Sequence, residues 1–105
     1  MKDDNTWELV GYKVKCKGSG AYQGKTPSIG FCAEKCEQVS SMFIFGTNDF
    51  GEVRCNNGLC ECYCEANTEN DGTCEQVDSN GYRLYRNKKW SKYNATSVSY
   101  LTRAN

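Results

Sequence analysis

The sequence predicts a single small α+β domain that is held together by about four disulfide bonds. Eight cysteines stand among 105 residues, whereas Leu, Ile, Val and Phe together number only 16. So few aliphatic side chains make a thin core, and a disulfide adds roughly 2–4 kcal/mol, mainly by restricting the unfolded chain. One segment has the start signal and apolar spacing of a helix, and several others have the alternation of strands.

The densest group of cysteines lies in residues 55–64. Side chains alternate between the two faces of an extended strand, so Cys60, Cys62 and Cys64 are expected on one face. The side chains on the other face are then Glu61, Tyr63 and Glu65. All eight cysteines are expected to be disulfide-bonded: Cys16, Cys32, Cys36, Cys55, Cys60, Cys62, Cys64 and Cys74.

The N-terminal part of the chain predicts a strand between two loops. Residues 1–9 are expected to be a loose segment. From Val10 to Cys16 the apolar residues alternate with polar ones, which predicts a half-buried strand with Lys13 and Lys15 on its basic outer face. Residues 17–25 contain three glycines and no large aliphatic side chain, so they are expected to form a loop.

The one strong helix signal follows this loop. Thr26 suits the N-cap and Pro27 suits the first helical position, where its missing N–H costs nothing. The helix is expected to continue to Val39 or Ser40. One stripe of its surface carries residues at helical spacing: Ile29, Cys32, Cys36 and Val39.

The rest of the domain predicts short strands. Residues 41–46 are apolar at every position but the first and last, which indicates a central strand that is covered on both faces. Asn57-Gly58 is the strongest short signal for a hairpin turn, and it precedes the cysteine-rich strand. An acidic loop is expected at residues 66–73. Further short strands are expected at residues 52–55, 74–77 and 81–86.

Charge is distributed unevenly although the formal net charge is zero. Residues 34–78 carry two basic and ten acidic groups, whereas residues 79–105 carry six basic groups and no acidic one. Residues 87–105 are basic, aromatic and free of cysteine, so they are expected to be extra strands, a linker or a binding arm. The opposite charges also suggest self-association.

Several functional classes are not expected. The chain has no histidine, which removes the usual general base near neutral pH. Glu61 and Glu65 would be about 13 Å apart on a strand, beyond the roughly 5–9.5 Å of glycosidase carboxylate pairs. The cysteine spacing lacks the two short knuckles of a zinc site, and the acidic segment 67–78 fits a calcium loop poorly. We therefore expect no enzyme, no metal and no cofactor.

The cysteine density favours an oxidising compartment and a secreted location. No apolar run approaches the ~18–20 residues that a membrane span needs, so no membrane insertion is expected. Residues 1–6 lack the apolar core of a signal peptide, which suggests a mature segment. Nucleic acid is not expected as a partner outside the cell. Asn94-Ala-Thr96 is a candidate site of N-glycosylation.

The order of these elements resembles the PAN/apple-like superfamily of secreted domains over residues 10–86. The resemblance rests on the Cys32-Ala-Glu-Lys-Cys36 helix, the aromatic strand 42–46, a cysteine-bearing strand and the final Gly-Tyr-Arg-Leu-Tyr strand at 81–85. It implies one helix packed on a curved antiparallel sheet. The chain departs from the family pattern at Ser40-Ser41, where many apple domains have a cysteine, and it has more cysteines at 55–64.

The resemblance also implies which cysteines pair and what the domain does. It implies that Cys32 and Cys36 each pair with a cysteine of the sheet. We expect these partners within the 55–64 group, and we expect Cys16 or Cys74 to pair with the remainder. Domains of this family bind proteins or carbohydrates and carry no catalytic machinery. The expected function is therefore a secreted, non-enzymatic binding module.

The expected ligand is an extracellular protein or a glycan, sulfated glycans included. The candidate contact residues are Tyr63, Tyr82, Tyr85, Trp90, Lys13, Lys15, Lys88 and Lys89. Tyr22, Tyr63, Tyr82 and Tyr85 could stack on sugar rings, although tyrosines in such a chain more often cover a thin core. The alternatives are a self-assembling matrix or fibre subunit, and a venom or defence-type protein.

Overall fold

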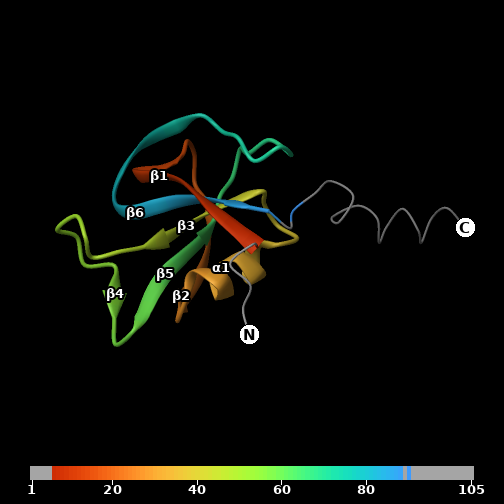
Figure 1. The fold of residues 1–105 in the computed structure, drawn as a ribbon. Coiled ribbons are helices and arrows are strands. Elements are labelled where there is room, and N and C mark those ends of the chain that lie inside the picture. Colours follow the sequence, from red (N-terminus) through yellow and green to blue (C-terminus); the bar gives the residue numbers. More distant parts are fainter. Residues whose placement is uncertain (1–5, 89, 91–105) are drawn as a thin grey trace, which may run out of the picture.

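A computed structural model describes residues 6–88 and Trp90. This part of the chain forms one helix and one antiparallel sheet with the strand order β1-β6-β3-β5-β2, and β4 pairs with β5 (Figure 1). The elements are β1 (Trp7–Cys16), β2 (Ala21–Thr26), α1 (Ile29–Cys36), β3 (Met42–Gly46), β4 (Cys55–Asn56), β5 (Leu59–Cys64) and β6 (Gln76–Asn87). The predicted α+β class, with one helix, an antiparallel sheet and four disulfides, is confirmed.

The helix is shorter than predicted at both ends. Its N-cap is Ser28, whose Oγ accepts a hydrogen bond from the N–H three residues further on. The predicted cap, Thr26, is instead the buried last residue of β2. The helix ends at Cys36, and Val39 is 56% exposed, so the apolar stripe does not continue past the last cysteine.

Two disulfides attach α1 to β5, as the resemblance implied. Cys32 pairs with Cys62 and Cys36 pairs with Cys64, with Cα–Cα distances of 5.6 and 5.3 Å. All four residues are at most 1% exposed. They form the centre of a core between the helix and the sheet, together with Phe43, Phe45 and Tyr85.

The other two disulfides correct the expected pairing. Cys16 or Cys74 was expected to pair with the remainder of the 55–64 group, but the two pair with each other. Cys55 and Cys60 face one another directly across the β4–β5 hairpin, so they pair within the group. The predicted Asn57-Gly58 turn is confirmed, with φ of 55° and 79°. Positive φ at both central residues is what a tight type I′ hairpin turn requires.

Strand β1 is longer and less regular than predicted. It begins at Trp7, so residues 1–9 are not all a loose segment, and Trp7 packs edge-on against Tyr85. The register against β6 shifts on either side of Gly11 and Tyr12, and Lys13 has a φ of 59°. These irregularities break the predicted alternation, so Tyr12 lies opposite Arg83 and is exposed.

The face of the sheet away from α1 has a second core. β6 bends between its two halves and β1 accompanies it (Figure 1). The buried residues of this core are Cys16, Met42, Ile44, Tyr82 and Leu84, and Val10, Val14 and Tyr63 pack against them. Every residue of β3 is buried, which confirms the prediction of a central strand covered on both faces.

Two further elements differ from the prediction because the sheet supplies hydrogen-bonding partners. Residues 17–25 were expected to be a loop, but Ala21–Thr26 forms β2 along the edge of β5. The separate strands expected at 74–77 and 81–86 are one strand, since β1 pairs with β6 along most of its length.

Removing the two kinds of disulfide should have unequal effects on stability. Cys36–Cys64 joins residues 28 apart and Cys55–Cys60 joins residues five apart. Because a longer closed loop restricts the unfolded chain more, we expect the Cys36→Ala/Cys64→Ala variant to lose about 1–2 kcal/mol more than the Cys55→Ala/Cys60→Ala variant. Urea denaturation of both variants measures this difference. Equal losses would contradict the expectation.

Candidate functional site

Three tyrosines form a row on the face of the sheet away from α1, and we call Tyr22, Tyr63 and Tyr82 the tyrosine row. Their ring centroids are 4.8 Å apart between Tyr22 and Tyr63, and 5.8 Å apart between Tyr63 and Tyr82. Tyr22 is 52% exposed, Tyr63 is half-buried and Tyr82 is buried. The row therefore leads from the open edge strand β2 toward the second core.

The alternation of side chains along β5 determines on which face of the sheet this row lies. Cys62 and Cys64 point to the helix, so Tyr63 between them points to the other face. Tyr22 lies directly opposite Tyr63 on β2. The disulfides of one face thus determine which aromatic side chain is available on the other.

A pocket of about 260 Å³ adjoins the row. It is lined by Lys15, Ser19, Gly20, Ile44, Tyr63, Glu65, Ser79 and Tyr82. The structure thus brings three of the predicted contact residues together: Lys15, Tyr63 and Tyr82. Sequence analysis missed Ser19, Gly20 and Ser79, because they lie in turn-like stretches whose partners only the tertiary structure shows.

Glu65 is a buried carboxyl group in the wall of this pocket. It is 4% exposed, although the strand pattern placed it on an outer face with Tyr63. Its Oε2 accepts a hydrogen bond of 2.6 Å from the N–H of Cys16, and its Oε1 is buried without a hydrogen-bond partner among the described residues. Burial raises the pKa of Glu65, and the Cys16 N–H and the charge of Lys15 oppose this rise.

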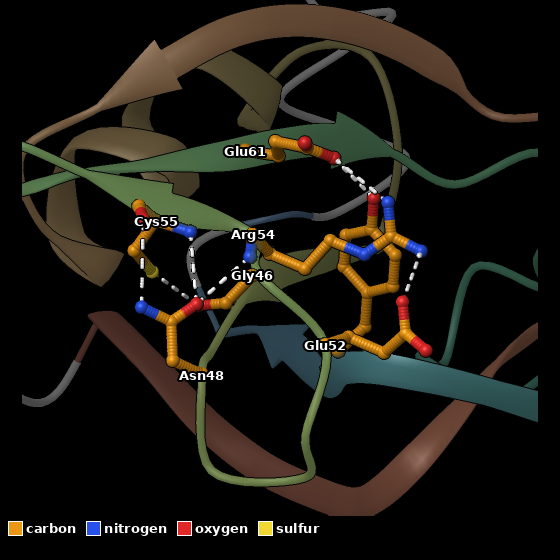
Figure 2. A network of polar contacts seen from close by, with 7 residues as sticks. Gly46, Asn48, Glu52, Arg54, Cys55 and Glu61 are labelled. Atoms are coloured by element: carbon orange, nitrogen blue, oxygen red, sulfur yellow. Dashed lines mark hydrogen bonds and ion pairs between the residues drawn. The ribbon is translucent and has the colours of Figure 1, made fainter.

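A polar network lies at the other end of the row (Figure 2). The Tyr82 hydroxyl donates a hydrogen bond to Glu61 Oε1, and the Arg54 guanidinium lies 4.9 Å from the centroid of the Tyr82 ring. Arg54 also makes ion pairs with Glu61 at 3.9 Å and with Glu52 at 3.7 Å. Burial and the bond to Glu61 raise the pKa of Tyr82, so it remains a neutral donor.

Asn48 fixes the backbone that carries Arg54 (Figure 2). Its Oδ1 accepts hydrogen bonds from the N–H groups of Arg54 at 2.8 Å and Cys55 at 3.1 Å. Gly46 lets this segment approach β3, because a Cβ at Gly46 would lie 2.7 Å from the Cβ of Arg54. The orientation of Arg54 over Tyr82 therefore depends on the hydrogen bonds that Asn48 accepts and on the absence of a side chain at Gly46.

The other predicted contact residues do not join this site. Tyr85 is 3% exposed and stacks on Phe43 in the helix-side core, so it is not part of the tyrosine row. Burial in this core also raises the pKa of Tyr85.

Lys13 belongs to a separate cluster, where its Nζ lies 5.5 Å from the centroid of the Phe50 ring. The bulges in β1 are the reason that Lys13 and Lys15 do not form one basic patch.

The predicted contact residues near the C-terminus, Lys88 and Trp90, lie away from the tyrosine row. Lys88 and Trp90 line a hollow with Arg86 and Asp71. Lys89 and Asn94 are outside the described residues. Among the described residues, the predicted contacts are therefore divided over separate surfaces.

Two clusters with metal-binding residue types have other roles. The sulfur atoms of Cys32, Cys36 and Cys62 lie within 4.8 Å of one another. Each belongs to a disulfide, so none is a thiolate that could bind zinc. In the acidic loop, the N–H of Glu69 donates to the carbonyl of Thr73, which closes a turn much shorter than a twelve-residue calcium loop.

Comparisons with protein-family models, curated proteins and solved structures found no match to the chain. The four disulfides indicate an oxidising environment. Within the described residues, no helix has the length and apolar character that crossing a membrane requires.

Replacing Asn48 should loosen the segment that carries Arg54. The Asn48→Ala variant leaves two backbone N–H groups without their acceptor, so we expect a loss of about 1–2 kcal/mol. Asn48→Asp keeps an acceptor oxygen and should lose less. Urea denaturation compares the variants with the wild type. Equal losses in the two variants would contradict the role of Oδ1.

Glu65 should make stability depend on pH. Its pKa in the folded protein is raised above the unfolded value of about 4.3. Its favourable contribution is therefore fully present below the unfolded pKa and is lost as pH rises through the folded pKa. We expect the free energy of unfolding of the wild type to fall over this interval relative to that of Glu65→Gln.

Urea denaturation from pH 4 to pH 8 measures this change. Glu75→Gln is the matched control, because the side chain of Glu75 is 72% exposed. A wild-type curve that stays parallel to the Glu65→Gln curve across the series would disprove the raised pKa.

Proposed function

We propose that this chain is a secreted, non-enzymatic binding domain of PAN/apple-like type that recognises glycans on the tyrosine row and in the adjoining pocket. One observation carries the proposal: three tyrosine rings from three strands lie side by side and lead to a pocket with charged and hydroxyl groups. The four disulfides support the oxidising compartment in which a secreted glycan-binding domain works.

The chemistry of a sugar ring fits this arrangement. A pyranose has a face of C–H groups and a rim of hydroxyl groups. The C–H face packs against an aromatic ring, and the hydroxyl groups need a few placed polar partners. Tyr22 offers an exposed ring at the edge of the sheet. Lys15, Ser19 and Ser79 offer polar groups in the pocket.

Binding is favoured over glycoside hydrolysis because the two carboxylates of this face are separated and engaged. Glu61 and Glu65 are four residues apart in and just beyond β5, a distance of about 13 Å along a strand. Glu61 bonds to Tyr82 and Arg54, and Glu65 bonds to the N–H of Cys16. Neither arrangement resembles an acid and a base on two sides of one bond.

The alternative of a self-assembling subunit depends on attraction between the acidic residues 34–78 and the basic residues 79–105. Two of its arginines are paired within the chain, since Arg83 binds Asp49 and Arg86 binds Glu8. Lys92 and Arg103 are outside the described residues. No observation within the described part favours this alternative or the venom and defence alternative over glycan binding.

A glycan array with neutral and sulfated sugars tests the proposal. Wild-type protein should bind a defined set of glycans, and Tyr22→Ala should weaken this binding about tenfold, which corresponds to about 1.4 kcal/mol. The loss is expected because the variant removes the exposed ring of the row. Since Tyr22 is half-exposed at an edge strand, the substitution should leave the fold intact.

Phe31→Ala is the matched control, because Phe31 is 49% exposed on α1, on the other side of the sheet. It should bind like the wild type. Absence of binding to every glycan, or equal losses in the two variants, would reject the tyrosine row as a glycan site and leave a protein ligand as the remaining candidate.

A further inference from the structure

We propose that the Cys55–Cys60 disulfide is a redox modification site: a dithiol reductant opens it in the folded protein, while the three other disulfides stay closed. This inference is independent of the proposed glycan binding. It starts from burial, because Cys55 and Cys60 are both half-buried in the β4–β5 hairpin. The four cysteines that join α1 to β5 are at most 1% exposed.

The chemistry of thiol–disulfide exchange requires access to a sulfur atom. A thiolate of the reductant attacks one sulfur of the disulfide, forms a mixed disulfide with it and expels the other sulfur as a thiolate, which takes up a proton. The second thiol of the reductant then attacks the mixed disulfide and releases the remaining cysteine thiol. Two electrons pass to the protein, and the reductant leaves as its own disulfide. The reaction therefore needs an open path to one sulfur and a favourable place for the expelled thiolate.

The Cys55–Cys60 pair meets both requirements. The residues between the two cysteines, 56–59, are all exposed, and a Cβ at Gly58 would meet nothing within 4 Å. Either sulfur is expelled at a half-buried position of the hairpin, where water can solvate a thiolate. After reduction the Cys55 thiol also has an acceptor, because its Sγ lies 3.5 Å from the carbonyl oxygen of Gly46 (Figure 2).

The Cys16–Cys74 disulfide is the nearest competitor. Cys74 is half-buried and lines a hollow beside Lys17, so a reductant can approach its sulfur. Attack there would expel Cys16, which is 1% exposed and whose Sγ lies 3.6 Å from the Sδ of Met42 in the second core. Apolar surroundings disfavour a thiolate, so Cys16 is a poor leaving group. Access at one end therefore does not make this disulfide easy to open.

The fold does not depend on the Cys55–Cys60 disulfide. The N–H of Glu61 donates to the carbonyl of Arg54, and Asn48 Oδ1 accepts from the N–H groups of Arg54 and Cys55. These backbone contacts remain when the S–S bond is broken. Opening the disulfide therefore loosens the hairpin and leaves the helix-to-sheet core in place.

The opened disulfide should be detectable at Tyr82, at the end of the tyrosine row. Arg54 directly precedes Cys55, and its guanidinium lies 4.9 Å from the centroid of the Tyr82 ring. Glu61 directly follows Cys60 and accepts the hydrogen bond of the Tyr82 hydroxyl (Figure 2). Each sulfur of the pair is thus one residue away from a side chain that contacts Tyr82. Reduction should change the surroundings of this ring.

The test is reduction of the wild-type protein with dithiothreitol in the absence of denaturant, followed by alkylation with iodoacetamide and peptide mass spectrometry. We expect Cys55 and Cys60 to be alkylated together and roughly 100-fold faster than the other six cysteines, because buried pairs react only from locally opened states. The Cys55→Ala/Cys60→Ala variant is the control and should take up no alkyl group over the same period. Reduction in concentrated urea should label all eight cysteines and shows that each is detectable.

NMR of the wild type with labelled tyrosines follows the same reduction and does not depend on how a variant folds. The Tyr82 signal should shift. The signal of Tyr85, which stacks on Phe43 in the helix-side core, should stay unchanged.

The contrary outcomes are distinct from a failure of glycan binding. Alkylation of Cys74 ahead of Cys55 and Cys60, or of all cysteines at one rate, would overturn the selectivity. Absence of alkylation until urea unfolds the domain, or a Tyr85 signal that shifts together with that of Tyr82, would overturn opening in the folded protein. An unchanged Tyr82 signal in the reduced protein would overturn the link to the tyrosine row.

Discussion

The structure depends on the double link between α1 and β5. Two cysteines four residues apart on a helix are separated by about 6 Å along its axis, and two cysteines two residues apart on a strand by about 6.7 Å. These distances match, so Cys32–Cys62 and Cys36–Cys64 both form when the helix lies along the strand in the same direction. The link replaces much of the aliphatic core that the chain lacks.

This link has consequences for the opposite face of the sheet. Because Cys62 and Cys64 point to the helix, Tyr63 between them must point to the other side of the sheet. That side is apolar at Ile44 and Leu84, so it needs a cover of its own. The bent pair of β1 and β6 provides it, and the disulfide between Cys16 and Cys74 belongs to this second layer.

The candidate site lies where this second cover ends. β1 reaches far enough for the N–H of Cys16 to hold Glu65, while Tyr22 on the far edge strand stays exposed. Between them is a pocket with both aromatic and charged walls. A polar group buried beside an open pocket costs stability, and such a cost is often found where a protein binds a ligand.

Much of the fold follows from local features of the sequence. Asn57-Gly58 specified a hairpin because both residues tolerate positive φ, and the apolar run at 41–46 specified a strand with two covered faces. The pattern at 60–64 specified which side chains share a face. Local features could not specify the end of the helix, because Val39 continues its apolar spacing but has no surface to pack on.

The site itself could be predicted only in part. The alternation of one strand was enough to select Tyr63, because the face of a side chain is a local property of the backbone. The position of Glu65 was not, since its burial depends on Cys16, a residue 49 positions away. The sequence by itself determined the disulfide-stapled α+β class and the two faces of the cysteine strand. Only the tertiary structure decided the register shifts in β1, the pairing of Cys16 with Cys74, and the meeting of Lys15, Tyr63 and Glu65, because these depend on contacts between segments far apart in the chain.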